Sequence, residues 1–203
     1  MNATQQLPAN YKQQEKLDFS QNEQGNGKVS PLLLRLNVVG LLFLVLFCYL
    51  FTLATTWLRE ASEQLFAFTL TDLLLWLITI PSSLIGVIIL HELVHGLFFW
   101  LFTKEKPHFG FKMVYAYAAA PTWYIPRNQF IIIGAAPLIL LTLAGLTLMA
   151  SVPKSLLPAL IFSLTFNAAG AVGDLYIIWW LLAKPSNVLI QDVGDVFTIY
   201  GAE

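Results

Sequence analysis

The chain contains 203 residues, of which 57% are hydrophobic and 11% are charged, and its net charge is −1. A soluble domain carries about a quarter charged residues, so this composition predicts an integral membrane protein, and the near-neutral charge gives no reason to expect a nucleic-acid partner. The single cysteine, Cys48, excludes an internal disulfide and a cysteine-based metal cluster.

The start of the chain is polar and rich in Gln, Asn, Lys and Glu. It contains no continuous apolar stretch, so we expect a flexible cytosolic tail over residues 1–34 rather than a signal peptide. A membrane domain is predicted to follow at 35–184, and a short cytosolic extension at 185–203.

Four apolar stretches follow the tail, and each is long enough to cross a hydrocarbon core of about 30 Å. They cover approximately residues 36–58, 70–102, 130–150 and 156–183. Lys and Arg are concentrated before the first stretch and between the second and third, which predicts that both termini are cytosolic. The expected fold is an all-α integral protein of the cell membrane. It is a bundle of about four transmembrane helices with a small cytosolic β-hairpin between the second and third.

The second apolar stretch contains the sequence His-Glu-Leu-Val-His at residues 91–95, although Leu73–Phe102 has no other ionisable residue. Because His91 and His95 are four residues apart, they lie on one face of a helix and can bind one metal ion. Glu92 can then act on a metal-bound water. A chance match is the alternative, but it would bury a carboxylate in mid-helix at a cost of a few kcal/mol. We therefore favour a metal site.

The connection between the second and third stretches alternates large apolar residues with small or polar ones from Phe109 to Tyr117. This period of two predicts a strand with one apolar face, close to the histidine motif. An unpaired strand edge can bind an extended peptide by main-chain hydrogen bonds. We therefore expect this segment to present substrate, with Lys112, Val114 and Tyr115 as contact residues. The alternative is a hairpin that only covers the bundle.

A catalytic zinc site needs a third protein ligand, and Asp174 is the strongest candidate. It is the only Asp, Glu, His, Lys or Arg between Lys154 and Lys184. It lies roughly 15 Å from the cytosolic end of the fourth helix, a depth that matches the roughly 10–16 Å of the two histidines. The alternative is a structural partner for a helix dipole or a serine, but the cost of a buried charge favours a metal ligand.

Asn167 lies seven residues before Asp174 and on the same helix face. It could hydrogen-bond a metal ligand or a substrate carbonyl, and the alternative is a polar contact between helices. After the fourth helix, Val196–Tyr200 has the composition of a strand. We expect it to pair with the Phe109–Tyr117 strand.

Together these residues predict a membrane-embedded zinc metalloprotease in which His91, His95 and Asp174 hold zinc and Glu92 transfers protons. The expected partners are a membrane-associated polypeptide substrate and the lipid bilayer; the oligomeric state is not predicted. One alternative is a catalytically inactive zinc-binding membrane protein. Another is a small transporter, which would show polar residues along a pathway. The ligand types also suit iron, manganese or cobalt.

The histidine motif followed by Gly96, in a small four-helix membrane protein, resembles the bacterial family of zincin membrane peptidases. The resemblance covers most of the chain after the polar tail and includes residues 115–117, Pro121 and the Gly-Asp pair at 173–174. More distantly, the chain is similar to the site-2 intramembrane metalloproteases, which carry this motif in one transmembrane helix and an aspartate ligand in a later one. In those proteins glycine follows the aspartate, whereas here Leu175 does. The resemblance implies peptidase activity.

Overall fold

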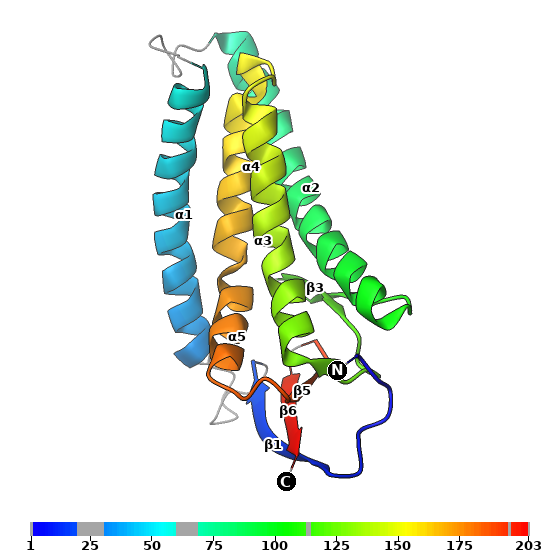
Figure 1. Ribbon diagram of the computed structural model, residues 1–203. Coiled ribbons are helices and arrows are strands. Elements are labelled where there is room, and N and C mark those ends of the chain that lie inside the picture. The colour runs from blue at the N-terminus through cyan, green and yellow to red at the C-terminus, as the bar shows by residue number, and fades with distance from the viewer. Residues whose placement is uncertain (1, 20–30, 60–68, 113–114, 195, 203) are drawn as a thin grey trace. The chain divides into compact units, whose positions relative to one another are not determined.

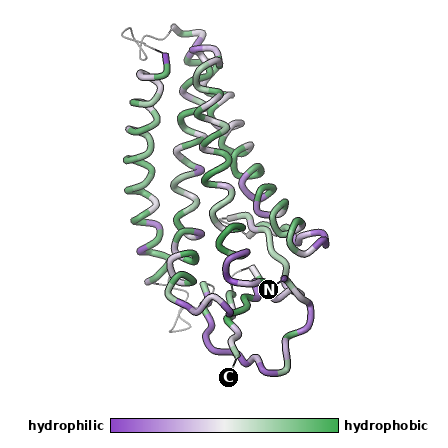
Figure 2. Tube along the Cα trace, viewed as in Figure 1, coloured by the Kyte–Doolittle hydropathy of each residue, from purple (hydrophilic) through white to green (hydrophobic). Residues whose placement is uncertain are grey.

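Four helical stretches are long and apolar enough to cross a membrane. The structure is a computed structural model that describes residues 2–19, 31–59, 69–112, 115–194 and 196–202. The helices are α1 (Pro31–Arg59), α2 (Leu70–Thr103), α3 (Arg127–Met149), η1 (Lys154–Leu156), α4 (Leu157–Gly170) and α5 (Val172–Leu182). The last three together make the fourth stretch. Hydrophobic residues predominate along α1, α2, α3 and α4 (Figure 2).

The chain divides into two compact units, and α1, α2 and α3 each contribute residues to both. We call the first the sheet unit; it comprises Met1–Asn37, Glu92–Ala136 and Gly173–Glu203. We call the second the helix unit; it comprises Val38–His91 and Pro137–Val172. Each unit has a hydrophobic core of its own.

An antiparallel four-stranded sheet organises the sheet unit (Figure 1). Its strands, in the order β1-β6-β5-β4, are β1 (Tyr11–Asp18), β6 (Val196–Ala202), β5 (Leu189–Asp192) and β4 (Ile125–Pro126). Ile190 of β5 and Ile199 of β6 are fully buried. They belong to one core cluster with Phe130 of α3 and Leu181 of α5. The sheet therefore packs against the ends of these two helices through apolar side chains.

Strand β1 lies where we expected a flexible tail, and that expectation is wrong for residues 11–18. The strand pairs with β6 along its length, beginning with Tyr11 opposite Ala202. Its five central residues are all exposed, so it has no apolar face from which a strand could be recognised. Main-chain hydrogen bonds hold it instead, together with the hydroxyl of Tyr11, which donates to the Asn187 carbonyl at 2.8 Å. The division of the chain at residues 34 and 184 stays a prediction.

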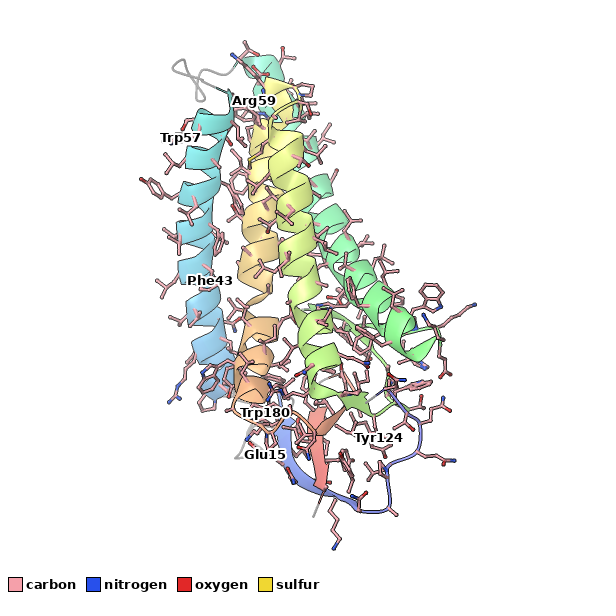
Figure 3. The ribbon with its side chains drawn as sticks, viewed as in Figure 1. Glu15, Phe43, Trp57, Arg59, Tyr124 and Trp180 are labelled. Atoms are coloured by element: carbon pink, nitrogen blue, oxygen red, sulfur yellow. The ribbon has the colours of Figure 1, made fainter. Side chains whose placement is uncertain are left out.

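Side chains of the N-terminal segment also contact α5 and the residues after it. The carboxylate of Glu15 accepts hydrogen bonds from Trp180 Nε1, at 2.8 Å, and from the ammonium of Lys184 (Figure 3). The hydrogen bond from Lys184 holds the pKa of the Glu15 carboxyl below its ordinary value. The ring of Phe19 meets Tyr176 edge-on, with 6.2 Å between the ring centroids. The N-terminal segment is therefore an integral part of the sheet unit.

A hairpin joins α2 to α3, as the sequence predicts. Its strands β2 (His108–Lys112) and β3 (Tyr115–Ala119) are antiparallel. The expected pairing of the C-terminal strand with this hairpin is wrong, because a tight turn at Gly194 returns β6 directly onto β5. Gly194 adopts a φ of +89°, which glycine tolerates without strain, and its N–H donates to Asp192 Oδ1 at 2.7 Å. The fold is thus mostly helical with small sheets, and the all-α expectation is wrong in this respect.

The helix unit has a smaller core, formed by Phe51, Met149, Ile161 and Leu164. Gly145 allows close packing there, because a Cβ at that position would lie 2.3 Å from Leu164 Cδ2. At the end of α1, Arg59 donates through Nε to the Met149 carbonyl at 2.7 Å and also bonds the Val152 carbonyl (Figure 3). These bonds satisfy carbonyls near the end of α3 that the helix itself leaves without donors.

The fourth apolar stretch is interrupted at Ala171, where the sequence predicts one continuous helix. The N–H of Ala171 donates to the carbonyls of both Asn167 and Ala169, and its ψ of −1° departs from helical values. Helix α5 therefore begins anew at Val172, and Asp174 lies in its first turn. A carboxylate in a first turn is favoured by the helix dipole.

Candidate metal centre

The histidine motif lies within α2 as continuous helix, so His91 precedes His95 by one turn on the same face. His95 is buried, with 8% of its surface exposed. The next residue, Gly96, lets the hairpin pack tightly on this helix, because a Cβ there would lie 2.4 Å from Phe109 Cζ. The β2 strand therefore contacts α2 immediately beside His95.

Asp174 lies beside His95, and 3.4 Å separate Asp174 Oδ2 from His95 Nε2. Two ligand atoms on one tetrahedral zinc, with bonds of about 2.0–2.1 Å, lie about 3.3 Å apart. The observed separation therefore matches that of two ligands of one metal ion. With His91, these residues form a candidate group of three metal ligands.

The ring of His95 is oriented by the main chain of α3. Its Nδ1 lies 3.0 Å from the carbonyl oxygen of Ile133. Because a carbonyl oxygen can only accept, Nδ1 carries the proton in this contact. In the neutral ring Nε2 then carries the lone pair, on the side where Asp174 lies, as a metal ligand requires.

The ring of His91 is oriented in the same way by a side chain. Its Nδ1 lies 2.9 Å from Asn167 Oδ1. Asn167 is 3% exposed, and its Nδ2 donates to the Pro137 carbonyl at 3.4 Å, which directs its oxygen toward His91. The structure thus places Asn167 against a predicted metal ligand and between helices, which fits both of the roles considered for it. In both histidines Nδ1 lies within hydrogen-bond distance of an oxygen acceptor, an arrangement typical of zinc ligands that bind the metal through Nε2.

The remaining predicted residues are placed less specifically. Glu92 lies in α2 next to His91 and is partly buried, and its role as proton carrier stays a prediction. The main chains of Lys112 and Tyr115 are paired where β2 ends and β3 begins. Val114 lies outside the described residues. The substrate contacts assigned to these three residues also stay predictions.

One contact at this centre could not be found by inspecting side chains. The acceptor for His95 is the main-chain carbonyl of Ile133. Every residue has such a carbonyl, so the identity of the side chain gives no sign of this contact. The only sequence signal nearby is Pro137, four residues later in α3.

Comparison with known proteins agrees with this donor set. No curated protein and no solved structure matches the chain. The sequence pattern of a family described as "Putative zincin peptidase" matches residues 84–189, which is more than half of the chain and includes both histidines and Asp174. Zincins are zinc peptidases, and the oxygen and nitrogen donors found here suit zinc. The chain belongs to this family of zincin peptidases.

Proposed function

We propose that the protein is a membrane-embedded zinc metallopeptidase that hydrolyses peptide bonds of membrane or membrane-proximal polypeptides. The observation that carries the proposal is the shared orientation of the two histidines. Each Nδ1 is bound to an oxygen acceptor, Ile133 O for His95 and Asn167 Oδ1 for His91, so that each Nε2 can bind a metal. Membership of the zincin peptidase family supports the same conclusion.

The residues have distinct roles in this proposal. His91, His95 and Asp174 would hold zinc, which when bound supplies a Lewis acid and a water of lowered pKa. Glu92 accepts the proton of the attacking water and returns it to the leaving amine as the peptide bond breaks. The partly buried position of Glu92 beside His91 suits a group that must exchange protons while being shielded from bulk water.

The four long apolar helices support a position in a lipid bilayer. The pairing of β1 with β6 supports placing both termini on one side, because β1 precedes the four helices and β6 follows them. The distribution of Lys and Arg supports the proposal that this side is the cytosolic face of a cell membrane. A water path and substrate entry from the cytosolic face follow from this orientation.

The hairpin is the part of the protein that we propose to hold an extended substrate. Its β2 strand packs on α2 beside His95, through Phe109 against Gly96. A substrate strand added to an edge of this two-stranded sheet would be held by main-chain hydrogen bonds. Substitution Lys112→Pro removes one donor, and we expect it to raise KM while zinc content is unchanged. Unchanged cleavage would argue against presentation by this strand.

The test of the proposal is the zinc content and peptidase activity of the detergent-purified protein. We expect about one zinc per chain in the wild type, because the site offers three ligands and a place for water. His95→Ala and Asp174→Ala should lose the metal. Glu92→Gln should keep the metal and lose activity by about 10²–10⁴-fold. His108→Ala is the matched control, since this third histidine is exposed at the start of β2.

Different outcomes separate the alternatives. A folded wild type that binds no zinc would remove the hydrolase proposal. Zinc bound by the wild type, with no hydrolysis of any membrane-associated polypeptide, would identify a non-catalytic zinc protein. Zinc retained by Asp174→Ala would exclude Asp174 as the third ligand.

A further inference from the structure

Pro137 lies in the interior of α3, where it changes the hydrogen bonding of the preceding turn. In an α-helix each carbonyl accepts from the N–H four residues later. Proline has no N–H, so the carbonyl of Ile133 lacks its helical donor, and the proline ring also pushes that carbonyl away from the helix axis. Ile133 is 1% exposed, so water is not a ready substitute. The carbonyl therefore needs another donor, and it has one in His95 Nδ1 at 3.0 Å.

The second link runs through the carbonyl of Pro137 itself. It accepts from Asn167 Nδ2 at 3.4 Å, and Asn167 Oδ1 in turn lies 2.9 Å from His91 Nδ1. An asparagine amide can turn over and exchange its oxygen and nitrogen. A carbonyl beside the nitrogen fixes the amide in the orientation that presents oxygen to His91.

From these two links we infer that Pro137 is a positioning residue for the metal centre. Its missing N–H reserves the Ile133 carbonyl for His95, and its own carbonyl orients Asn167 for His91. The inference rests on the proposed function, since it concerns the ligands of the proposed zinc. The inference gives a reason for a helix-breaking residue in the interior of an apolar helix.

Replacing the proline should affect the two histidines differently. In Pro137→Ala the new N–H bonds the Ile133 carbonyl, which turns back toward the helix axis and away from His95. The carbonyl of residue 137 is retained, so the link through Asn167 to His91 should survive. A merely structural role for the proline, such as shaping the helix, would not distinguish one histidine from the other.

The experiment measures zinc affinity by competition with a chelator, together with the ¹H–¹⁵N signals of the histidine Nδ1–H groups in the zinc-loaded protein. We expect Pro137→Ala to weaken zinc binding by about 10–100-fold, the usual effect of losing a hydrogen bond to a metal ligand. The Nδ1–H signal of His95 should move while that of His91 stays. Asn167→Ala should give the reverse. Pro81→Ala is the matched control, a proline inside α2 about three turns before His91.

A rescue variant separates the missing N–H from the shape of the proline ring. An alanine side chain on a backbone-ester linkage at position 137 lacks the N–H, as proline does, and should restore wild-type zinc affinity. The inference is overturned if the wild type binds zinc and Pro137→Ala binds it equally well, or if the signals of both histidines move together. A folded wild type without zinc affinity would instead overturn the proposed function on which the inference rests.

Discussion

The sheet unit and the helix unit differ in how they bury apolar surface. Within the described residues, the core cluster of the sheet unit has thirteen buried members, drawn from strands and from helix ends. That of the helix unit has four. Only 11% of the most apolar part of α1 and 6% of that of α2 are buried by the protein itself. The sheet unit is thus stabilised by its own packing, whereas α1 and α2 leave most of their apolar surface exposed, as suits helices long and apolar enough to cross a membrane.

The largest effect should come from a cavity in the sheet unit. Ile190→Ala removes a fully buried side chain of β5. We expect it to lower the free energy of unfolding by about 2–5 kcal/mol, because the surrounding core relaxes only partly. Denaturation in detergent micelles measures the change. Phe162→Ala is the control in the helix unit, since Phe162 is 39% exposed. A loss as large for Phe162→Ala as for Ile190→Ala would contradict the difference between the units.

A charge on the outer surface of α1 tests whether lipid covers the helix unit. Val45 is near the middle of the helix and 64% exposed. Val45→Arg should raise the free energy of membrane insertion by about 2.5–3.5 kcal/mol. An insertion assay with a glycosylation reporter gives this value, and Val45→Leu serves as the neutral control. Insertion of Val45→Arg as efficient as that of Val45→Leu would mean that this face meets water or another polar surface.

The smallest effect concerns the exposed ion pair of the sheet unit. The pKa of Glu15 is lowered by its hydrogen bond from Lys184. The stability that it contributes is therefore present above the ordinary carboxyl pKa, and it is lost as the pH falls through the lowered value. Melting temperatures measured from pH 7 down to pH 3 should show a small acid-dependent loss, which Glu15→Gln lacks. An identical pH profile in Glu15→Gln would mean that the ion pair of Glu15 and Lys184 does not contribute to stability.

The helices and the candidate ligands could be predicted from the sequence because their signals are local. A run of apolar residues long enough to cross a bilayer identifies α2, and the three ionisable residues within Leu73–Phe102 draw attention to His91 and His95. Asp174 is conspicuous for the same reason. The roles of these residues in binding metal nevertheless stay predictions. That they lie at a similar level could be predicted because the constant rise of a helix gives the distance of each residue from the end of its helix.

The sheet could not be predicted in the same way because its pairing is non-local. β1 has no apolar face, and its partner β6 lies at the other end of the chain. The alternation from Phe109 to Tyr117 correctly indicated extended structure, but the expectation of a single strand is wrong, because the segment belongs to two strands, β2 and β3, that pair with each other. The acceptor for His95 is a carbonyl whose availability depends on the absence of a donor at Pro137. This contact can be recognised only when the positions of α2 and α3 are known.

The pairing of β1 with β6 has a consequence for biosynthesis. The ribosome makes β1 before any of the four long helices and makes β6 after all of them. At about 5–20 residues per second, β1 must wait many seconds for its partner. All four long helices are made during that time, but the sheet unit cannot close until β6 has been made. The sheet unit, which contains His95 and Asp174, therefore forms only after all four long helices have been made.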